Sequence, residues 1–151
     1  MNIRKGNINN LKDCLQSVEN SKLGEVYYHD KEKITPIFSE YLQKGHIYVA
    51  EVKGKTAGYI WYDEIGVFSA FPYIRSFAIK SEFRGKGIGN QMLEFAEKKA
   101  KEKRNKIFLL VSDFNADAKR LYESRGYIPL TKIDDLFVAG VGEFIMMKNL
   151  D

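Results

Sequence analysis

The segment Arg84-Gly85-Lys86-Gly87-Ile88-Gly89 constrains this chain most, because alternate glycines and two cations stand where a strand pattern gives way to a helix pattern. Glycine adopts positive φ easily and lets the backbone approach a ligand closely. The first N–H groups of a helix have no intrahelical partner, and the helix dipole favours an anion at that end. With the full charges of Arg84 and Lys86, the segment predicts a loop that binds a pyrophosphate without a metal.

The spacing of these glycines disfavours two common phosphate-binding motifs. A P-loop needs Ser or Thr directly after Gly-Lys, but Gly87 follows Lys86. The dinucleotide fingerprint needs two residues between its second and third glycines, whereas only Ile88 separates Gly87 from Gly89. Nucleotide hydrolysis and a Rossmann cofactor are therefore not expected. The alternative interpretation is a flexible helix entry with solvated cations.

Composition favours one globular domain over residues 1–151. The chain is 44% hydrophobic, which is enough for a sizeable core. Its 24 Lys and Arg against 20 Asp and Glu give a net charge of +4, which suits an anionic cofactor without requiring nucleic acid. The basic run from Lys98 to Lys106 is interrupted or flanked by Glu94, Glu97 and Glu102, as on a solvated helix face. We therefore expect no nucleic-acid partner.

Cysteine content and hydropathy bear on the compartment. Cys14 is the only cysteine, so no intramolecular disulfide or multi-cysteine zinc site can form. No apolar run approaches the roughly 20 residues that cross a bilayer. We expect a cytoplasmic protein with no membrane partner.

Hydrophobic periodicity predicts strands that alternate with helices, and hence one mixed sheet covered by helices. Ser21 to Asp30 is expected to be a connector, and Pro36 a kink or a late start of the helix that follows it. The expected strands lie near Ile3, His46–Val52, Thr56–Tyr62, Tyr73–Ile79, Ile107–Val111, Tyr127–Leu130 and Gly142–Met147. The expected helices carry Leu11 to Val18, Ile34 to Leu42, Ile88 to about Arg104, and Asn115 to Ser124.

Taken together, the glycine loop and the later segment Asn115-Ala116-Asp117-Ala118-Lys119-Arg120-Leu121-Tyr122-Glu123-Ser124-Arg125-Gly126-Tyr127 resemble the GCN5-related N-acetyltransferases, the GNAT family. The loop matches that family's Arg/Gln-x-x-Gly-x-Gly/Ala motif. The later segment matches its Asn…Ala…Leu-Tyr-Glu…Gly-Tyr/Phe signature, and the order of elements agrees over nearly the whole chain. The resemblance implies an α/β (α+β) fold with a single mixed, mostly antiparallel sheet of about six or seven strands and about four helices.

The resemblance also implies an N-acetyltransferase that moves the acetyl group of acetyl-CoA to a primary amine by direct attack in a ternary complex. Asn115 would contact the pantetheine arm, and Tyr122 would face the thioester sulfur as a catalytic residue. The strand at Phe77 would splay from its neighbour and offer backbone groups to the pantetheine. The full implied cofactor set is Phe77, Ala78, Ile79, Arg84, Gly85, Lys86, Gly87, Ile88, Gly89, Asn115 and Tyr122.

The general base is less evident. Some relatives carry a glutamate where this chain has Leu110, and others carry one where it has Tyr73. Glu64, expected at the end of the third strand, ranks first as the catalytic base. The remaining candidates are Asp63, Asp113 and a water chain, and each carboxylate could equally be a solvated loop residue.

The remaining residue types suggest neither a metal nor a covalent intermediate. His29 and His46 have no ligand spacing around them, so we predict no metal. Cys14 lies on an apolar stripe without an adjacent base. The competing functions are a non-catalytic acyl-CoA-binding module and, less favoured, a nucleic-acid-binding domain.

The acceptor remains open between a small-molecule amine and a peptide amino group, and the chain could be a monomer or a homodimer. By the resemblance, the acceptor would be framed by Ser21 to Asp30 and by Thr131 to Val141. Candidate contacts to a cationic amine are Glu25, Tyr27, Tyr28, Asp134 and Asp135.

Overall fold

The computed structural model describes residues 1–151, which form two compact units. The first unit comprises Met1–Tyr62 and Ser76–Ala96, and the second comprises Asp63–Arg75 and Glu97–Asp151. Two strands and one helix contribute residues to both units. A single domain over the whole chain stays a prediction.

The strands form a seven-stranded sheet in the order β1-β2-β3-β4-β5-β7-β6. Four of its ladders, β1–β2, β2–β3, β5–β7 and β6–β7, are antiparallel, and β4–β5 is parallel. The predicted mixed, mostly antiparallel sheet is therefore confirmed. The strand bounds are β1 Asn2–Lys5, β2 Ile47–Val52, β3 Lys55–Val67, β4 Phe71–Ile79, β5 Lys106–Ser112, β6 Ile128–Ile133 and β7 Glu143–Asn149.

Five α-helices accompany the sheet, and none is both long and apolar enough to cross a bilayer. Their bounds are α1 Leu11–Ser17, α2 Lys22–Tyr27, α3 Lys31–Gln43, α4 Ile88–Lys101 and α5 Ala116–Ser124, and the 3₁₀ turns are η1 Ile8–Asn10 and η2 Ser81–Phe83.

Helix α2 and the start of α3 correct the sequence expectations. The connector predicted for Ser21 to Asp30 is wrong, because Ser21 caps a short helix by accepting the N–H of Gly24. Six residues are too few to show a helical repeat in the sequence. Pro36 lies inside α3, which begins upstream of it where Asp30 accepts the N–H of Lys33. Pro36 is the sixth residue of the helix, so its missing N–H leaves one carbonyl, that of Glu32, without its helical donor.

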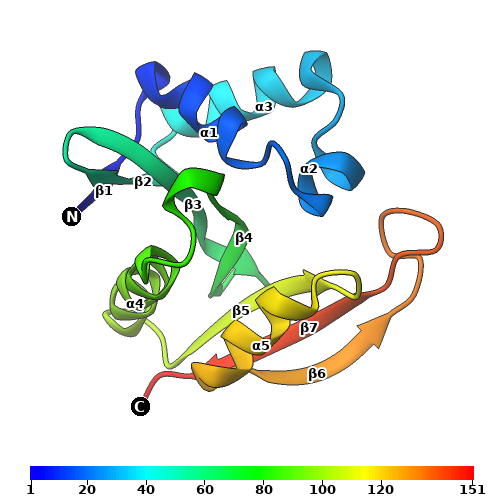
Figure 1. Cartoon of the computed structure of the whole chain (residues 1–151). Helices are drawn as coiled ribbons and strands as arrows, with labels where there is room; N and C mark the ends of the chain where they lie inside the picture. Colours follow the sequence, from blue (N-terminus) through cyan, green and yellow to red (C-terminus); the bar gives the residue numbers. More distant parts are fainter. The chain divides into compact units, whose positions relative to one another are not determined.

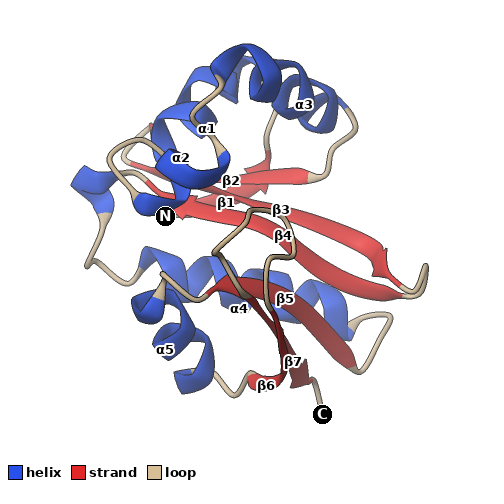
Figure 2. Cartoon of the chain, turned by 90° about the vertical axis from the view of Figure 1, so that its right-hand side faces the viewer, coloured by secondary structure: helices blue, strands red, loops and turns tan.

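The core of the first unit lies between β2–β3 and the helices α1 and α3. Figure 2 shows α1, α2 and α3 together on one side of β1, β2 and β3. The Phe38 ring contacts the rings of Tyr59 and Trp61 at 5.3 and 5.5 Å. On the other face of β2, Tyr48 contacts Phe95 of α4 at 5.0 Å. Cys14, which the sequence places on an apolar stripe, is fully buried in this core, and burial raises the pKa of its thiol to about 12.

In the second unit, β5, β7 and β6 run side by side, and α5 packs on β5 (Figure 1). Leu109 of β5 and Met146 of β7 are register partners and are almost fully buried. The strand predicted at residues 107–111 is thus confirmed, and most of its residues are buried. Two ends differ from expectation, since α4 stops at Lys101 and β6 continues to Ile133.

A tight hairpin turn joins β3 to β4. The N–H of Ala70 donates to the carbonyl of Val67, and both central residues have positive φ, +55° at Phe68 and +54° at Ser69. Such turns favour Asn-Gly, because L side chains with a bulky Cβ substituent are strained in this region. Phe68 gains no packing in return, since it is 84% exposed.

Replacing this pair by Asn-Gly (Phe68→Asn with Ser69→Gly) should therefore raise the free energy of unfolding by about 1 kcal/mol. Urea denaturation followed by circular dichroism measures the change. Phe68→Ala is the control, because it removes the ring and keeps the turn strain, so stability should stay within about 0.5 kcal/mol. A large loss of stability in Phe68→Ala would instead show that the Phe68 ring packs against the protein.

Candidate active site

The glycine loop leads from η2 into α4 in the first unit. Gly85 has φ +74° and Gly87 has φ +79°, so both adopt the region that favours glycine. A Cβ built on either residue would meet no protein atom within 4 Å. The backbone therefore borders open space directly before the first N–H groups of α4. This combination fits a diphosphate, which needs close backbone approach and unsatisfied donors.

The two cations of the loop are exposed. Arg84 donates from Nε to the carbonyl oxygen of Ile79 at 2.9 Å, which ties the loop to the end of β4. The Lys86 ammonium lies 5.7 Å from the centre of the Phe83 ring. Both charges are therefore accessible to an anion from solvent.

Residues Phe77, Ala78 and Ile79 are the last three of β4. The parallel ladder between β4 and β5 comprises only Tyr73↔Phe108 and Ile74↔Leu109, so these three residues lie beyond it. Their side chains are half-buried. Gly58 of β3 lies directly against this segment, since a Cβ there would come 2.4 Å from the carbonyl oxygen of Ala78.

The other predicted cofactor residues, Asn115 and Tyr122, both belong to α5 in the second unit. Asn115 is the N-cap, and its Oδ1 accepts the N–H of Ala118 at 3.3 Å. Tyr122 is only 7% exposed, and burial raises the pKa of its hydroxyl above the ordinary value. Its ring meets the edge of the Tyr127 ring at 5.8 Å.

A buried ionic cluster that the sequence patterns did not predict lies beside these tyrosines. Glu97, expected on a solvated face, is only 7% exposed and pairs with Arg125 and Lys148. Burial alone would raise the pKa of Glu97, but hydrogen bonds from the two cations outweigh it and lower that pKa. Helical spacing could have indicated this burial. Glu97 lies four residues after Leu93 and three before Ala100, both fully buried, and hence on the same face of the helix.

Two of the carboxylates expected as candidate bases, Glu64 and Asp113, lie in the second unit, and each is held by hydrogen-bond donors. Glu64 lies inside β3 rather than at its end, because the strand runs on to Val67. It is exposed and ion-paired with Lys103, whose hydrogen bond lowers the pKa of Glu64. For Asp113, the backbone N–H of Gly142 at 3.0 Å is the main cause of a lowered pKa. Both groups are thus ionised at neutral pH and are weaker bases than free carboxylates.

One cavity of the first unit includes part of the segment expected to frame the acceptor. It has a volume of about 500 Å³, and Tyr28, His29 and Glu25 lie in its wall. The hydroxyl of Tyr28 is 2.9 Å from that of Ser76, which is 2.7 Å from the Tyr59 hydroxyl. Tyr27, Asp134 and Asp135 are not among its lining residues.

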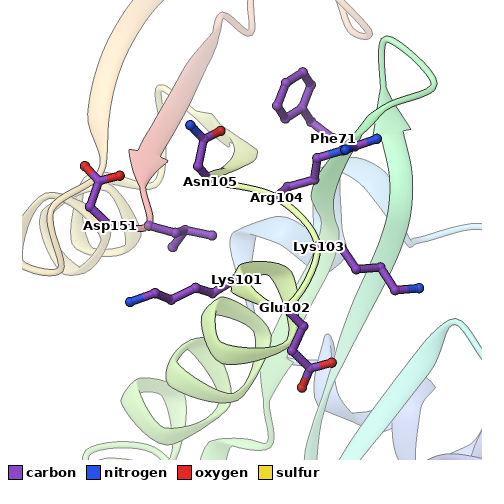
Figure 3. A pocket seen from close by; sticks show the side chains of 8 residues that line it. Phe71, Lys101, Glu102, Lys103, Arg104, Asn105 and Asp151 are labelled. Carbon is purple, nitrogen blue, oxygen red and sulfur yellow. The ribbon is translucent and has the colours of Figure 1, made fainter.

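A second open cavity, of about 550 Å³, lies at the end of α4 in the second unit (Figure 3). Lys101, Lys103 and Arg104 surround it with Phe71 and the terminal Asp151. None of the predicted cofactor residues lines it. No group of three His, Cys, Asp or Glu side chains in the structure is placed to hold a metal ion.

Comparisons with known proteins identify the family. The sequence model of the acetyltransferase (GNAT) family matches residues 11–127. An uncharacterized N-acetyltransferase of the pepI 3′ region in Lactobacillus delbrueckii subsp. lactis is 33% identical over 113 residues, which are 68% of this chain and 64% of that protein. The chain therefore spans less than two thirds of that relative's length. A second uncharacterized N-acetyltransferase, from Archaeoglobus fulgidus, is 30% identical over 135 residues, 83% of this chain and 91% of that protein.

Solved structures agree on the fold. The structure of yncA from Salmonella typhimurium, determined with its cofactor acetyl-CoA, superposes with a TM-score of 0.74 at 17% identity. The superposition covers 100% of this chain and 94% of that one. The chain belongs to the acetyltransferase (GNAT) family, which confirms the resemblance.

The lowered pKa of Glu97 predicts how stability depends on pH. A carboxyl whose pKa is lower in the folded state contributes stability above its unfolded pKa, and the contribution is lost as pH falls through the folded value. Glu97→Gln should therefore lower the free energy of unfolding at pH 7 by about 2 kcal/mol. The difference from the wild type should begin to shrink as pH falls below the ordinary value of 4.5, and it should disappear once pH is below the lowered pKa of the folded protein.

Urea denaturation at several pH values measures this difference. Glu123→Gln is the matched control, because Glu123 is exposed and pairs only along the helix with Lys119. It should show little change at any pH. If the free energies of unfolding of Glu97→Gln and the wild type differed by the same amount from pH 7 to pH 3, the stabilising role of the ionised Glu97 would be contradicted.

Proposed function

We propose that this acetyltransferase moves the acetyl group of acetyl-CoA to a primary amine by direct attack within a ternary complex. The observation that carries the proposal is the open, positive-φ conformation of Gly85 and Gly87 at the start of α4. The names of the two N-acetyltransferase relatives support nitrogen as the acceptor atom. Acetyl-CoA would supply an activated acyl thioester.

In this proposal the loop Arg84–Gly89 holds the diphosphate through backbone N–H groups and the exposed cations. Backbone groups of Phe77–Ile79 bind the pantetheine arm, and one N–H polarises the acetyl oxygen. The β4–β5 ladder stops at Ile74, which supports this use of the later residues. Asn115 uses its Oδ1 for the cap, so we assign its side-chain amide N–H groups to the pantetheine.

Tyr122 stabilises the departing thiolate by donating a hydrogen bond from its hydroxyl. A thiol has a pKa of about 8.5 and tyrosine one of about 10. Full transfer of the proton from a tyrosine hydroxyl to the thiolate is therefore uphill by roughly 2 kcal/mol. Burial raises the pKa of Tyr122 further and widens that gap. The proton therefore stays on the Tyr122 oxygen, and the hydroxyl acts as a donor.

The acceptor amine must lose its proton before it attacks. An amine with a pKa of about 10.4 is mostly protonated at pH 7, which adds roughly 4.6 kcal/mol to the barrier. We propose Glu64 as the group that receives this proton, with Asp113 or a water chain as the alternative. The cavity beside Tyr28 and Glu25 is our candidate for the acceptor.

Acetyl-CoA turnover on a panel of amines and peptides tests the function, with two variants. Gly87→Glu should raise the KM for acetyl-CoA at least about tenfold, because the side chain fills the open space and repels the diphosphate. Tyr122→Phe should lower kcat about 100-fold with little change in affinity for coenzyme A, as for loss of one transition-state donor. Mass spectrometry of the products identifies the acceptor.

Gly54→Glu is the matched control for Gly87→Glu. Gly54 also has φ +77° with no atom within 4 Å of a built Cβ, but it lies in the β2–β3 turn. Its variant should lose a similar amount of stability and keep the wild-type KM. Wild-type rates in both Gly87→Glu and Tyr122→Phe would refute the assignment. Tight binding of coenzyme A without turnover on any amine would favour the non-catalytic acyl-CoA-binding module.

The role of Glu64 has its own test in the pH dependence of kcat/KM. If Glu64 is the base, Glu64→Gln should lower kcat by about 100-fold and remove the acid limb of the profile. Lys103→Met should move that limb to higher pH, because the ion pair lowers the pKa of Glu64. An unchanged acid limb in both variants would transfer the role to Asp113 or to water.

A further inference from the structure

The cluster centred on Glu97 joins three elements of the second unit. Glu97 lies on α4, and its carboxylate accepts from Arg125 Nε at 3.1 Å and from Arg125 Nη2 at 2.7 Å. Lys148 of β7 donates to the same carboxylate at 2.9 Å. A buried carboxylate persists only when it is paired in this way. The fork of Arg125 also has a fixed geometry, so the contact orients as well as attracts.

Arg125 connects this carboxylate to the backbone of Tyr122. Arg125 is the C-cap of α5, and its backbone N–H donates to the Tyr122 carbonyl at 3.0 Å. The N–H of Tyr127 donates to the same carbonyl at 3.1 Å. Gly126, with φ +95°, turns the chain between these two donors. The last turn of α5 is therefore held at Tyr122 by a residue whose side chain is fixed on α4.

The aromatic rings provide a second connection between Glu97 and Tyr122. Tyr127 is only 2% exposed, and its ring packs edge-on against that of Tyr122. The Tyr127 hydroxyl is buried near Glu97 without a hydrogen bond of normal geometry, and Lys148 lies 5.9 Å from the ring centre. Both the carbonyl and the ring of Tyr122 thus depend on residues gathered around Glu97.

We propose that Glu97 is a positioning residue for Tyr122. Its carboxylate holds Arg125 and Lys148, and through them it fixes the backbone and the ring that aim the Tyr122 hydroxyl. The consequence for catalysis rests on the proposed function of Tyr122, whereas the effect on its position does not. Small displacements of a catalytic donor cost rate, so the cluster would set kcat without touching the substrates.

The test combines kinetics with nuclear magnetic resonance of ¹³C-labelled tyrosine, in which Tyr122→Phe assigns the Tyr122 signal. Glu97→Gln should shift or broaden the Tyr122 ring signal. It should lower kcat about tenfold and leave the KM for acetyl-CoA within about twofold. In a Tyr122→Phe background the same substitution should cause no further loss of kcat, because the coupled residues act as one unit. Glu123→Gln should change neither the signal nor kcat.

An unmoved Tyr122 signal in Glu97→Gln would overturn the inference, as would an equal loss of kcat with and without the Tyr122 hydroxyl. A shifted signal in an enzyme whose Tyr122→Phe variant is fully active would instead refute the proposed role of Tyr122 and leave its positioning by Glu97 intact. Arg125→Lys provides the second variant. It keeps the charge and the backbone N–H but loses the fork, so smaller changes in the same direction are expected.

Discussion

The burial of one carboxylate organises the second unit. Glu97 is withdrawn from solvent on α4, and its charge is compensated by Arg125 at the end of α5 and Lys148 on β7. Leaving either cation without this partner would cost more than the pair itself contributes, because a lone buried charge has no solvent to stabilise it. The three elements are thereby held in one arrangement, and Tyr122 lies within it.

In the first unit, the proposed binding loop depends on the backbone conformation of its glycines. Positive φ at Gly85 and Gly87 lets the chain turn from η2 into α4 without side chains in the way. Arg84 then attaches the loop to the end of β4 at Ile79. The proposed diphosphate site and the strand proposed to bind pantetheine are therefore parts of one connected piece of backbone.

Several features could be predicted from the sequence because their causes are local. The hairpin around Gly54, the capping role of Asn115 and the buried strand at residues 107–111 follow from turn chemistry, capping and hydrophobic runs. Helix α2 escaped prediction because a six-residue helix shows no periodicity. The extent of β3 past Tyr62 also escaped, because exposed residues such as Glu64 and Ile65 carry no strand pattern.

The sequence by itself determined the family, the mixed sheet and the glycine loop, since each depends on residue types at short spacing. Only the tertiary structure decided that Glu97 is buried while its neighbour Glu102 is exposed, and that Glu64 is held by Lys103. Burial and ion pairing depend on which distant residues the fold brings together. Arg125 and Lys148 lie far from Glu97 along the chain, so no local pattern could show their contact.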